Sequence, residues 1–129
     1  MGRWAGLDGR GPVTVDRGTL VLVELDPTVG HEQRGVRPCI CVSDPAVNAD
    51  QRYPLIAVVP VTGTPGEGAL YPQLLAGASG LVKPSYALID RLRSIDKRRI
   101  RRVFGRITDD EVMAVDQGLQ LFLGLTRLP

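Results

Sequence analysis

The sequence is poor in the residues that disulfide and metal chemistry require. Its 129 residues include two cysteines and one histidine, and aromatic residues make up 5% of the chain. Cys39 and Cys41 are two positions apart on a predicted strand and therefore point to the same face, a spacing that is unfavourable for a disulfide. A single histidine does not allow the usual Cys and His sets of a zinc site. We predict two small buried cysteines, and no metal or other cofactor.

The sequence also lacks a long apolar run. No stretch approaches the roughly 20 apolar residues of a membrane-spanning helix, and 43% hydrophobic with 23% charged residues is typical of a globular protein. Residues 1–16 are rich in glycine and have no secretory-signal pattern. We therefore predict a flexible N-terminal extension over 1–16, one compact domain over 17–129, a cytoplasmic location and no membrane partner.

The small net charge of +2 is unevenly distributed along the chain. Half of the sixteen Lys and Arg residues lie in one short segment in which Asp96 is the only acid: Arg91, Arg93, Lys97, Arg98, Arg99, Arg101, Arg102 and Arg106. Such a segment favours a polyanionic partner, because Lys and Arg contacts to phosphates supply much of the affinity for nucleic acids. On charge alone, a solvated basic strand face is an equally good interpretation.

Short runs of β-branched and aliphatic residues, bounded by turn formers, predict five or six strands. They cover residues 20–25, 38–43, 55–62, 69–75, 86–92 and 100–107, and residues 44–54 form a connection with a short turn. Pro60 indicates that the third strand is an edge strand or is irregular near its end. Loops of hairpin length predict a small, strongly curved antiparallel sheet.

The last element is predicted to be a helix that ends near Leu123. Thr108 and Glu111 have the spacing of a capping box, and Ile107 and Val112 can form a hydrophobic staple across the first turn. Apolar residues then recur at helical spacing, so one face of the helix should pack on the sheet.

One strand end carries a side chain suited to phosphate binding. Arg37 stands immediately before Pro38, so its guanidinium is held at a stiff point and can contact phosphate oxygens bidentately. Thr62 ends the third strand. On the residues alone, a surface ion pair for the arginine and a turn-capping role for the threonine remain open.

A longer pattern places these residues in a familiar context. Arg17-Gly18, a hydrophobic strand, the loop from Pro27 to Gln33 with Gly30-His31-Glu32, and Arg37-Pro38 resemble the opening of the MazF/PemK family of toxin endoribonucleases, also known through Kid. Residues 92–97 and 105–107 resemble the second signature of the family. The resemblance extends from residue 17 to about 123. It implies an SH3-like barrel with a terminal helix, shared with the gyrase-poisoning toxin CcdB, and a homodimer.

The resemblance also implies a reaction and a partner. The expected activity is sequence-selective, metal-independent cleavage of single-stranded RNA, with mRNA as the first candidate substrate and rRNA or tRNA as alternatives. Attack by the 2′-hydroxyl leaves 2′,3′-cyclic phosphate and 5′-hydroxyl ends. Arg37 is then catalytic, Thr62 hydrogen-bonds the scissile phosphate, and His31 assists as acid or base. Members are inhibited by a cognate antitoxin whose acidic C-terminal segment occupies the RNA groove.

Further residues are expected to bind the substrate: Glu32, Gln33, Arg34, Asp90 and Arg93. Asp90 aligns with a catalytic Asp of the PemK/Kid branch, but Leu88 stands where that branch has Arg, so its Arg–Asp pair cannot form. We expect Asp90 to contact a base instead, or to pair with Arg91 or Arg93.

The alternative function is a CcdB-like toxin without catalysis, or an RNA-binding module, and neither needs Arg37 and Thr62.

Overall fold

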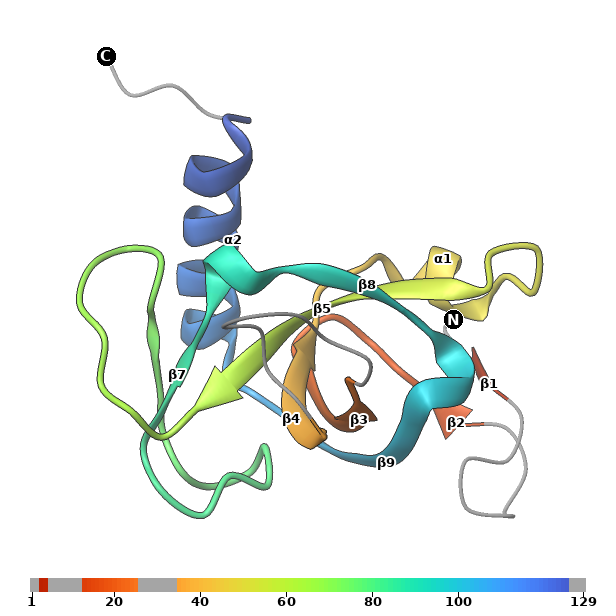
Figure 1. The fold of residues 1–129 in the computed structure, drawn as a ribbon, viewed down its shortest axis with the longest axis horizontal. Coiled ribbons are helices and arrows are strands. Elements are labelled where there is room, and N and C mark those ends of the chain that lie inside the picture. Colours follow the sequence, from red (N-terminus) through yellow and green to blue (C-terminus); the bar gives the residue numbers. More distant parts are fainter. Residues whose placement is uncertain (1–2, 5–12, 26–34, 126–129) are drawn as a thin grey trace.

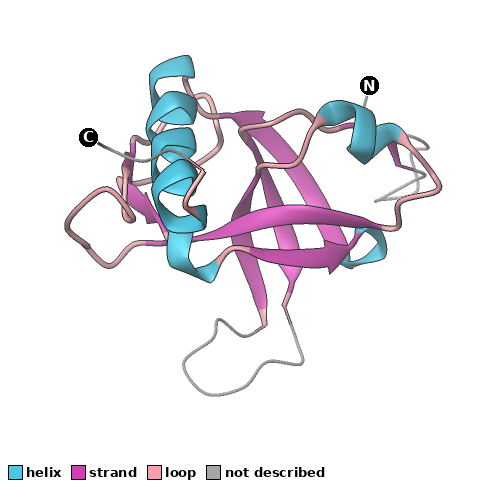
Figure 2. Cartoon of the chain, turned by 90° about the horizontal axis from the view of Figure 1, so that it is seen from above, coloured by secondary structure: helices cyan, strands magenta, loops and turns pink. Residues whose placement is uncertain are grey.

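The computed structural model describes residues 3–4, 13–25 and 35–125. Figures 1 and 2 show a strongly curved sheet with helix α2 (Asp109–Leu123) at one end and the short helix α1 (Pro45–Ala49) at the other. Within these described ranges, no helix has both the length and the apolar character needed to cross a membrane.

All strand pairs in the described chain are antiparallel. The main sheet has the order β6 (Gln73–Leu74), β7 (Ser85–Ala87), β5 (Leu55–Thr62), β4 (Val36–Cys41), β3 (Thr19–Glu24) and β9 (Ile100–Arg106), and β8 (Arg93–Asp96) pairs with β5 beside this path. Two short strands, β1 (Arg3–Trp4) and β2 (Val13–Thr14), pair with each other. The structure confirms a mainly β fold with a C-terminal helix.

The sheet buries both of its faces. On β4, Cys39 and Cys41 belong to the core inside the curled sheet, whereas Ile40 belongs to a second core that includes Val115 of α2. On β5, Val58 and Val59 divide between the two cores in the same way. Both cysteines are fully buried and free, as predicted. The uninterrupted apolar runs of these strands are explained by this two-sided burial.

Helix α2 begins and ends as the sequence predicts. The Thr108 hydroxyl accepts from the Glu111 N–H, the Glu111 carboxylate accepts from the Thr108 N–H, and the helix is closed by Gly124 at a φ of 68°. Gly118 is needed for close packing, because a Cβ there would lie 2.7 Å from the Ala69 carbonyl oxygen.

The Arg17-Gly18 dipeptide ties α2 to the sheet. The Arg17 guanidinium donates to the Val42 carbonyl oxygen at 2.8 Å and forms a bidentate ion pair with Asp116 of α2. This hydrogen-bonded pair raises the pKa of Arg17. Gly18 has a φ of 87°, and a Cβ on it would lie 2.7 Å from the Val112 side chain. The Arg17-Gly18 dipeptide therefore has a structural role, which is to hold α2 against the sheet.

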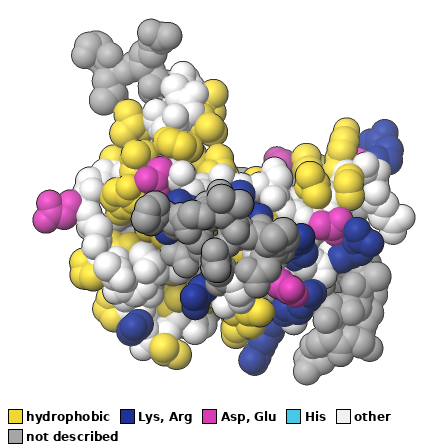
Figure 3. All heavy atoms as spheres, in the orientation of Figure 1, with side chains coloured by type: hydrophobic (Ala, Val, Ile, Leu, Met, Phe, Trp, Pro, Cys, Tyr) yellow, Lys and Arg dark blue, Asp and Glu magenta, His cyan; other side chains and the backbone are white. Residues whose placement is uncertain are grey.

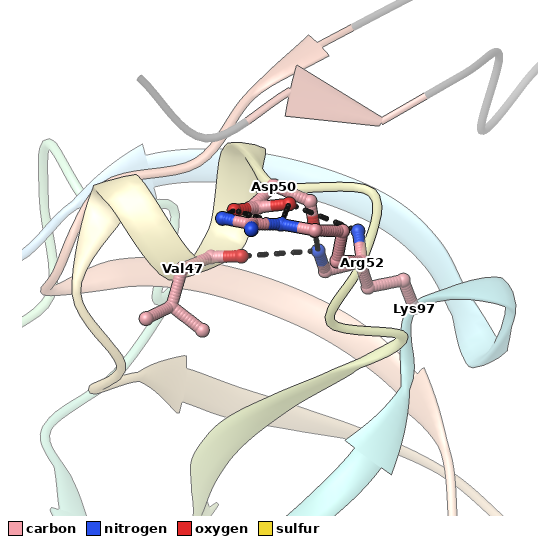
Figure 4. Close-up of polar contacts among 4 residues, drawn as sticks. All are labelled: Val47, Asp50, Arg52 and Lys97. Carbon is pink, nitrogen blue, oxygen red and sulfur yellow. Dashed lines mark hydrogen bonds and ion pairs between the residues drawn. The ribbon is translucent and has the colours of Figure 1, made fainter.

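The far end of the sheet is held by Lys97, in the 3-10 turn η2 (Lys97–Arg99). Its ammonium donates to the carbonyl oxygens of Val47 and Asp50 at 3.2 and 3.1 Å (Figure 4). Hydrogen bonds from Arg52 lower the pKa of the Asp50 carboxyl to about 2. These contacts fasten α1 to the chain that follows β8.

Strand β5 is central rather than an edge strand, but the irregularity that Pro60 predicted near its end is present. Its partner on one side changes from β8, which pairs with residues 55–58, to β7, which pairs with residues 61–62. The Pro60 carbonyl accepts from the Leu88 N–H at this change. The proline nitrogen faces the same side, where no ladder bond is interrupted.

Four further differences from the sequence expectations concern short elements. The strand expected over 69–75 is reduced to β6, and the one expected over 86–92 is β7 followed by the 3-10 turn η1 (Ile89–Arg91). Strand β8 was not predicted, because its Arg and Asp residues mask the single buried Ile95. Helix α1 was also missed, although Asp44 as N-cap and Pro45 at the first position are ordinary helix-start signals.

Candidate active site

Arg37 and Thr62 lie at neighbouring strand ends. Arg37 is the second residue of β4 and is exposed, and Thr62 is the last residue of β5 and is half-buried. The β4–β5 ladder ends at the pair Cys39–Pro60, and Arg37 and Thr62 each lie two residues beyond it, on the face of their strand that carries Cys39 and Pro60. Two groups that are 25 positions apart in the chain therefore lie just past the same end of the β4–β5 ladder.

Both side chains are available for a ligand. The Arg37 guanidinium makes no ion pair or hydrogen bond with any residue that the structure describes. The Thr62 oxygen accepts from the Thr64 N–H at 3.1 Å. Because this bond uses only an acceptor position, the hydroxyl proton can still be donated to a phosphate oxygen.

A pocket of about 350 Å³ opens next to Thr62. Its walls come from the loop after β5 and from the β7–η1 segment, and they comprise Thr62, Thr64, Pro65, Gly66, Tyr71, Tyr86, Leu88 and Arg91. Tyr86 is the direct partner of Thr62 in the β5–β7 ladder. Sequence reasoning missed Tyr71, Tyr86 and Arg91, because it gave no register between β5 and β7.

Asp90 lies at the rim of this pocket. Its carboxylate accepts from the Tyr71 hydroxyl at 2.6 Å, and this hydrogen bond raises the pKa of Tyr71. Leu88 is buried in the pocket wall. The partner of Asp90 is therefore a tyrosine rather than either of the arginines expected from the sequence.

Arg93 is half-buried on β8. Its guanidinium donates to the Leu25 carbonyl oxygen at a long 3.4 Å, which links β8 to the end of β3. Its charge also acts on Cys39, but burial dominates there and raises the pKa of that thiol to about 12. The predicted site residues His31, Glu32, Gln33 and Arg34 lie outside the described residues.

In the folded protein, ion pairs with acidic residues neutralise part of the charge of the basic segment. Three of its arginines pair with acids: Arg98 with Asp96, Arg101 with Glu24, and Arg106 with Asp109. Within the described ranges, those without an acidic partner are Arg91, Arg93, Arg99 and Arg102. Figure 3 shows Lys and Arg side chains spread from the centre of one face toward its lower right. The basic segment therefore keeps four arginines without an acidic partner among the described residues.

Metal binding is not indicated by the described part of the chain, in which no group of three or more His, Cys, Asp or Glu side chains is placed to hold an ion. The chemistry that these residues offer is hydrogen bonding and charge stabilisation by an arginine and a threonine.

Comparison with known proteins identifies the family to which this chain belongs. A family model described as the PemK-like, MazF-like toxin of type II toxin-antitoxin systems matches residues 16–123. The chain belongs to this family. A curated relative, endoribonuclease EndoA of Bacillus subtilis (strain 168), is 28% identical over 111 residues, which are 86% of this chain and 96% of that protein.

Solved structures of the family have the same fold. MazF of Deinococcus radiodurans matches with a TM-score of 0.73 and 31% identity, over 87% of this chain and 98% of that one. A MazE–MazF complex from the same organism matches with a TM-score of 0.69 and 29% identity, over 88% and 99% of the two chains. The barrel-like fold implied by the sequence resemblance is thereby confirmed.

Proposed function

We propose that this protein is the toxin of a type II toxin-antitoxin pair and that it acts as a sequence-selective endoribonuclease on single-stranded RNA. The observation that carries the proposal is the position of Arg37 and Thr62 past the same end of the β4–β5 ladder, with Thr62 lining an open pocket. The family membership of residues 16–123 and the similarity to an endoribonuclease support it.

The reaction that this arrangement serves is internal transfer of the phosphodiester. The 2′-oxygen of the substrate loses its proton to a base and bonds to phosphorus, and the bond to the 5′-oxygen breaks as that oxygen gains a proton. The products carry a 2′,3′-cyclic phosphate and a 5′-hydroxyl. Arg37 binds the phosphoryl oxygens as their charge grows, and Thr62 donates a hydrogen bond to them. His31 is the proposed proton carrier.

The exposed cations also suit an acidic peptide. We propose that the cognate antitoxin places an acidic C-terminal segment over the same face, that the toxin is a homodimer, and that it works in the cytoplasm. The Deinococcus MazE–MazF complex supports a protein partner of this kind. We further propose residues 17–129 as the toxin domain, with 1–16 as an extension.

Incubation with a mixed-sequence RNA in EDTA tests the activity. We expect fragments that end in 2′,3′-cyclic phosphate and begin with a 5′-hydroxyl, measured by end-specific ligation and sequencing. A requirement for Mg²⁺ would remove the 2′-hydroxyl mechanism. Intact RNA at every site, together with unchanged RNA binding by an Arg37→Ala variant, would favour a toxin or RNA binder without catalysis.

RNA binding should weaken steeply with salt. If three or four of the unpaired arginines contact phosphates, the affinity for an uncleavable, 2′-O-methylated RNA should fall roughly 20- to 50-fold between about 50 and 200 mM salt. Fluorescence anisotropy measures this slope. Arg52→Ala is the control, because Arg52 is engaged by Asp50 beside α1, and it should leave the slope unchanged. A flat response would place the basic segment away from the RNA.

A further inference from the structure

The pocket beside Thr62 has the composition of a site for a flat aromatic ring. The chain has three tyrosines, and two of them, Tyr71 and Tyr86, line this one pocket. Leu88 adds an apolar wall, while Thr64 and Arg91 add polar groups. Its volume of about 350 Å³ lies within the usual range for small-molecule pockets.

The tyrosines are held in place before any ligand arrives. Tyr86 is fixed in β7 between two ladders, opposite Thr62 on β5 and opposite Gln73 on β6. Tyr71 is held by its hydrogen bond to Asp90 and by the loop after β5, where a Cβ on Gly66 would lie 2.9 Å from the Tyr71 Cβ. Binding of an aromatic ring in this pocket therefore costs little conformational entropy of the two tyrosine side chains.

The position of the pocket relates it to the reaction. Thr62 and Tyr86 are direct neighbours across a ladder, and Arg37 belongs to β4, the strand on the other side of β5. Neighbouring strands are about 4.8 Å apart, so the tyrosine lies one strand away from the group that binds the scissile phosphate. This spacing matches a base whose own phosphate lies at Thr62.

The charges at the pocket favour a base over a phosphate. The Asp90 carboxylate stands at the Tyr71 hydroxyl and would repel a second phosphate group there. Arg91 carries donors only, so it can read acceptor atoms on the edge of a base. Stacking on aromatic side chains is the general way in which proteins hold unpaired bases.

We propose that the pocket formed by Tyr71, Tyr86, Leu88 and Arg91 binds one unstacked nucleobase of the RNA next to the cleaved linkage and sets the sequence preference at that position. This inference rests on the proposed function, since it assigns a part of the substrate to a part of the same site. Tyr86 supplies a stacking surface, Tyr71 a second wall, and Arg91 the contact to the base edge.

The test is an abasic scan of the site that cleavage mapping of the unmodified protein identifies, and its readout is binding rather than cleavage. A set of 2′-O-methylated RNAs, each lacking one base of the preferred cleavage site, is titrated against the protein and against Tyr86→Ala. We expect one abasic position to weaken binding to the unmodified protein on the order of tenfold to hundredfold, and the same position to make little further difference in Tyr86→Ala. Additive losses at every position would overturn the proposal.

A control variant separates this role from loss of structure. Tyr53→Ala removes the third tyrosine, which is exposed and outside the pocket, and should keep the full abasic effect. A misfolded variant weakens binding to all RNAs alike, which the position-specific comparison detects.

Cleavage mapping of Arg91 variants completes the test. Arg91→Ala and Arg91→Lys should both relax the base preference at the identified position, because lysine lacks the planar fork. Uniformly weaker cleavage at all sites in Arg91→Ala, restored in Arg91→Lys, would assign Arg91 to a phosphate and overturn its role in base reading.

If the unmodified protein cleaves RNA and the abasic scan shows no single sensitive position, only this inference fails. Absence of cleavage by the unmodified protein contradicts the proposed function itself.

Discussion

Arg37→Ala should reduce the rate of RNA cleavage by about 10²- to 10³-fold while leaving the fold intact. The guanidinium belongs to the strand next to the one that ends at Thr62, and it makes no side-chain bond to another described residue. Its removal therefore takes away charge stabilisation in the transition state without breaking a contact in the folded protein. Single-turnover cleavage of a short RNA measures the first effect, and urea unfolding measures the second.

The control for Arg37→Ala is Arg52→Ala, which removes an equally exposed arginine at the α1 end of the sheet. It should leave both the cleavage rate and the unfolding free energy almost unchanged, the latter within about 0.5 kcal/mol. Arg37→Lys should recover only part of the rate, because an ammonium does not reproduce the bidentate contact. Full activity of Arg37→Ala would remove this residue from the mechanism.

Gly105→Ala should lower the free energy of unfolding by about 3 kcal/mol. Gly105 lies in β9, where its N–H donates to the Ser79 carbonyl oxygen at 2.9 Å. A Cβ there would overlap the Ala78 carbonyl oxygen and lie 3.3 Å from the Ser79 Cα, so backbone rather than a flexible side chain would have to move. Urea denaturation followed by circular dichroism measures the loss.

Gly63→Ala is the matched control for Gly105→Ala. A Cβ on Gly63 would meet only the end of the Lys83 side chain, at 2.8 Å, and that end can turn away. We expect a change of about 0.5 kcal/mol or less. Equal stability of the two variants would mean that the chain over residues 78–79 yields to β9 instead of being packed tightly against it.

The elements that the sequence predicted well are those whose signals are local. The bounds of β5 and the capping box of α2 follow from neighbouring residues, and the structure confirms both. Strand β8 has one buried residue, Ile95, and becomes a strand because the free side of β5 offers it a partner. No pattern within β8 itself carries that information.

The basic segment likewise combines a feature that the sequence shows with one that depends on distant residues. The sequence shows eight basic residues between 91 and 106, but Glu24, which neutralises Arg101, is contributed by a distant strand. The sequence therefore indicates that a polyanion is favoured, and only the folded chain shows which cations are left to bind it. Arg91 is one of these, and it lines the pocket beside Thr62.

By itself, the sequence determined the fold class, the burial of the cysteines, the terminal helix and the identity of Arg37 and Thr62 as phosphate-binding candidates. Only the tertiary structure decided that Tyr86 stands opposite Thr62, that Tyr71 binds Asp90, and that Pro60 lies in a central strand. The reason is physical: propensities and caps act between near neighbours. The register of two strands depends instead on how distant buried faces fit together, and a shift by one residue would turn every side chain to the opposite face.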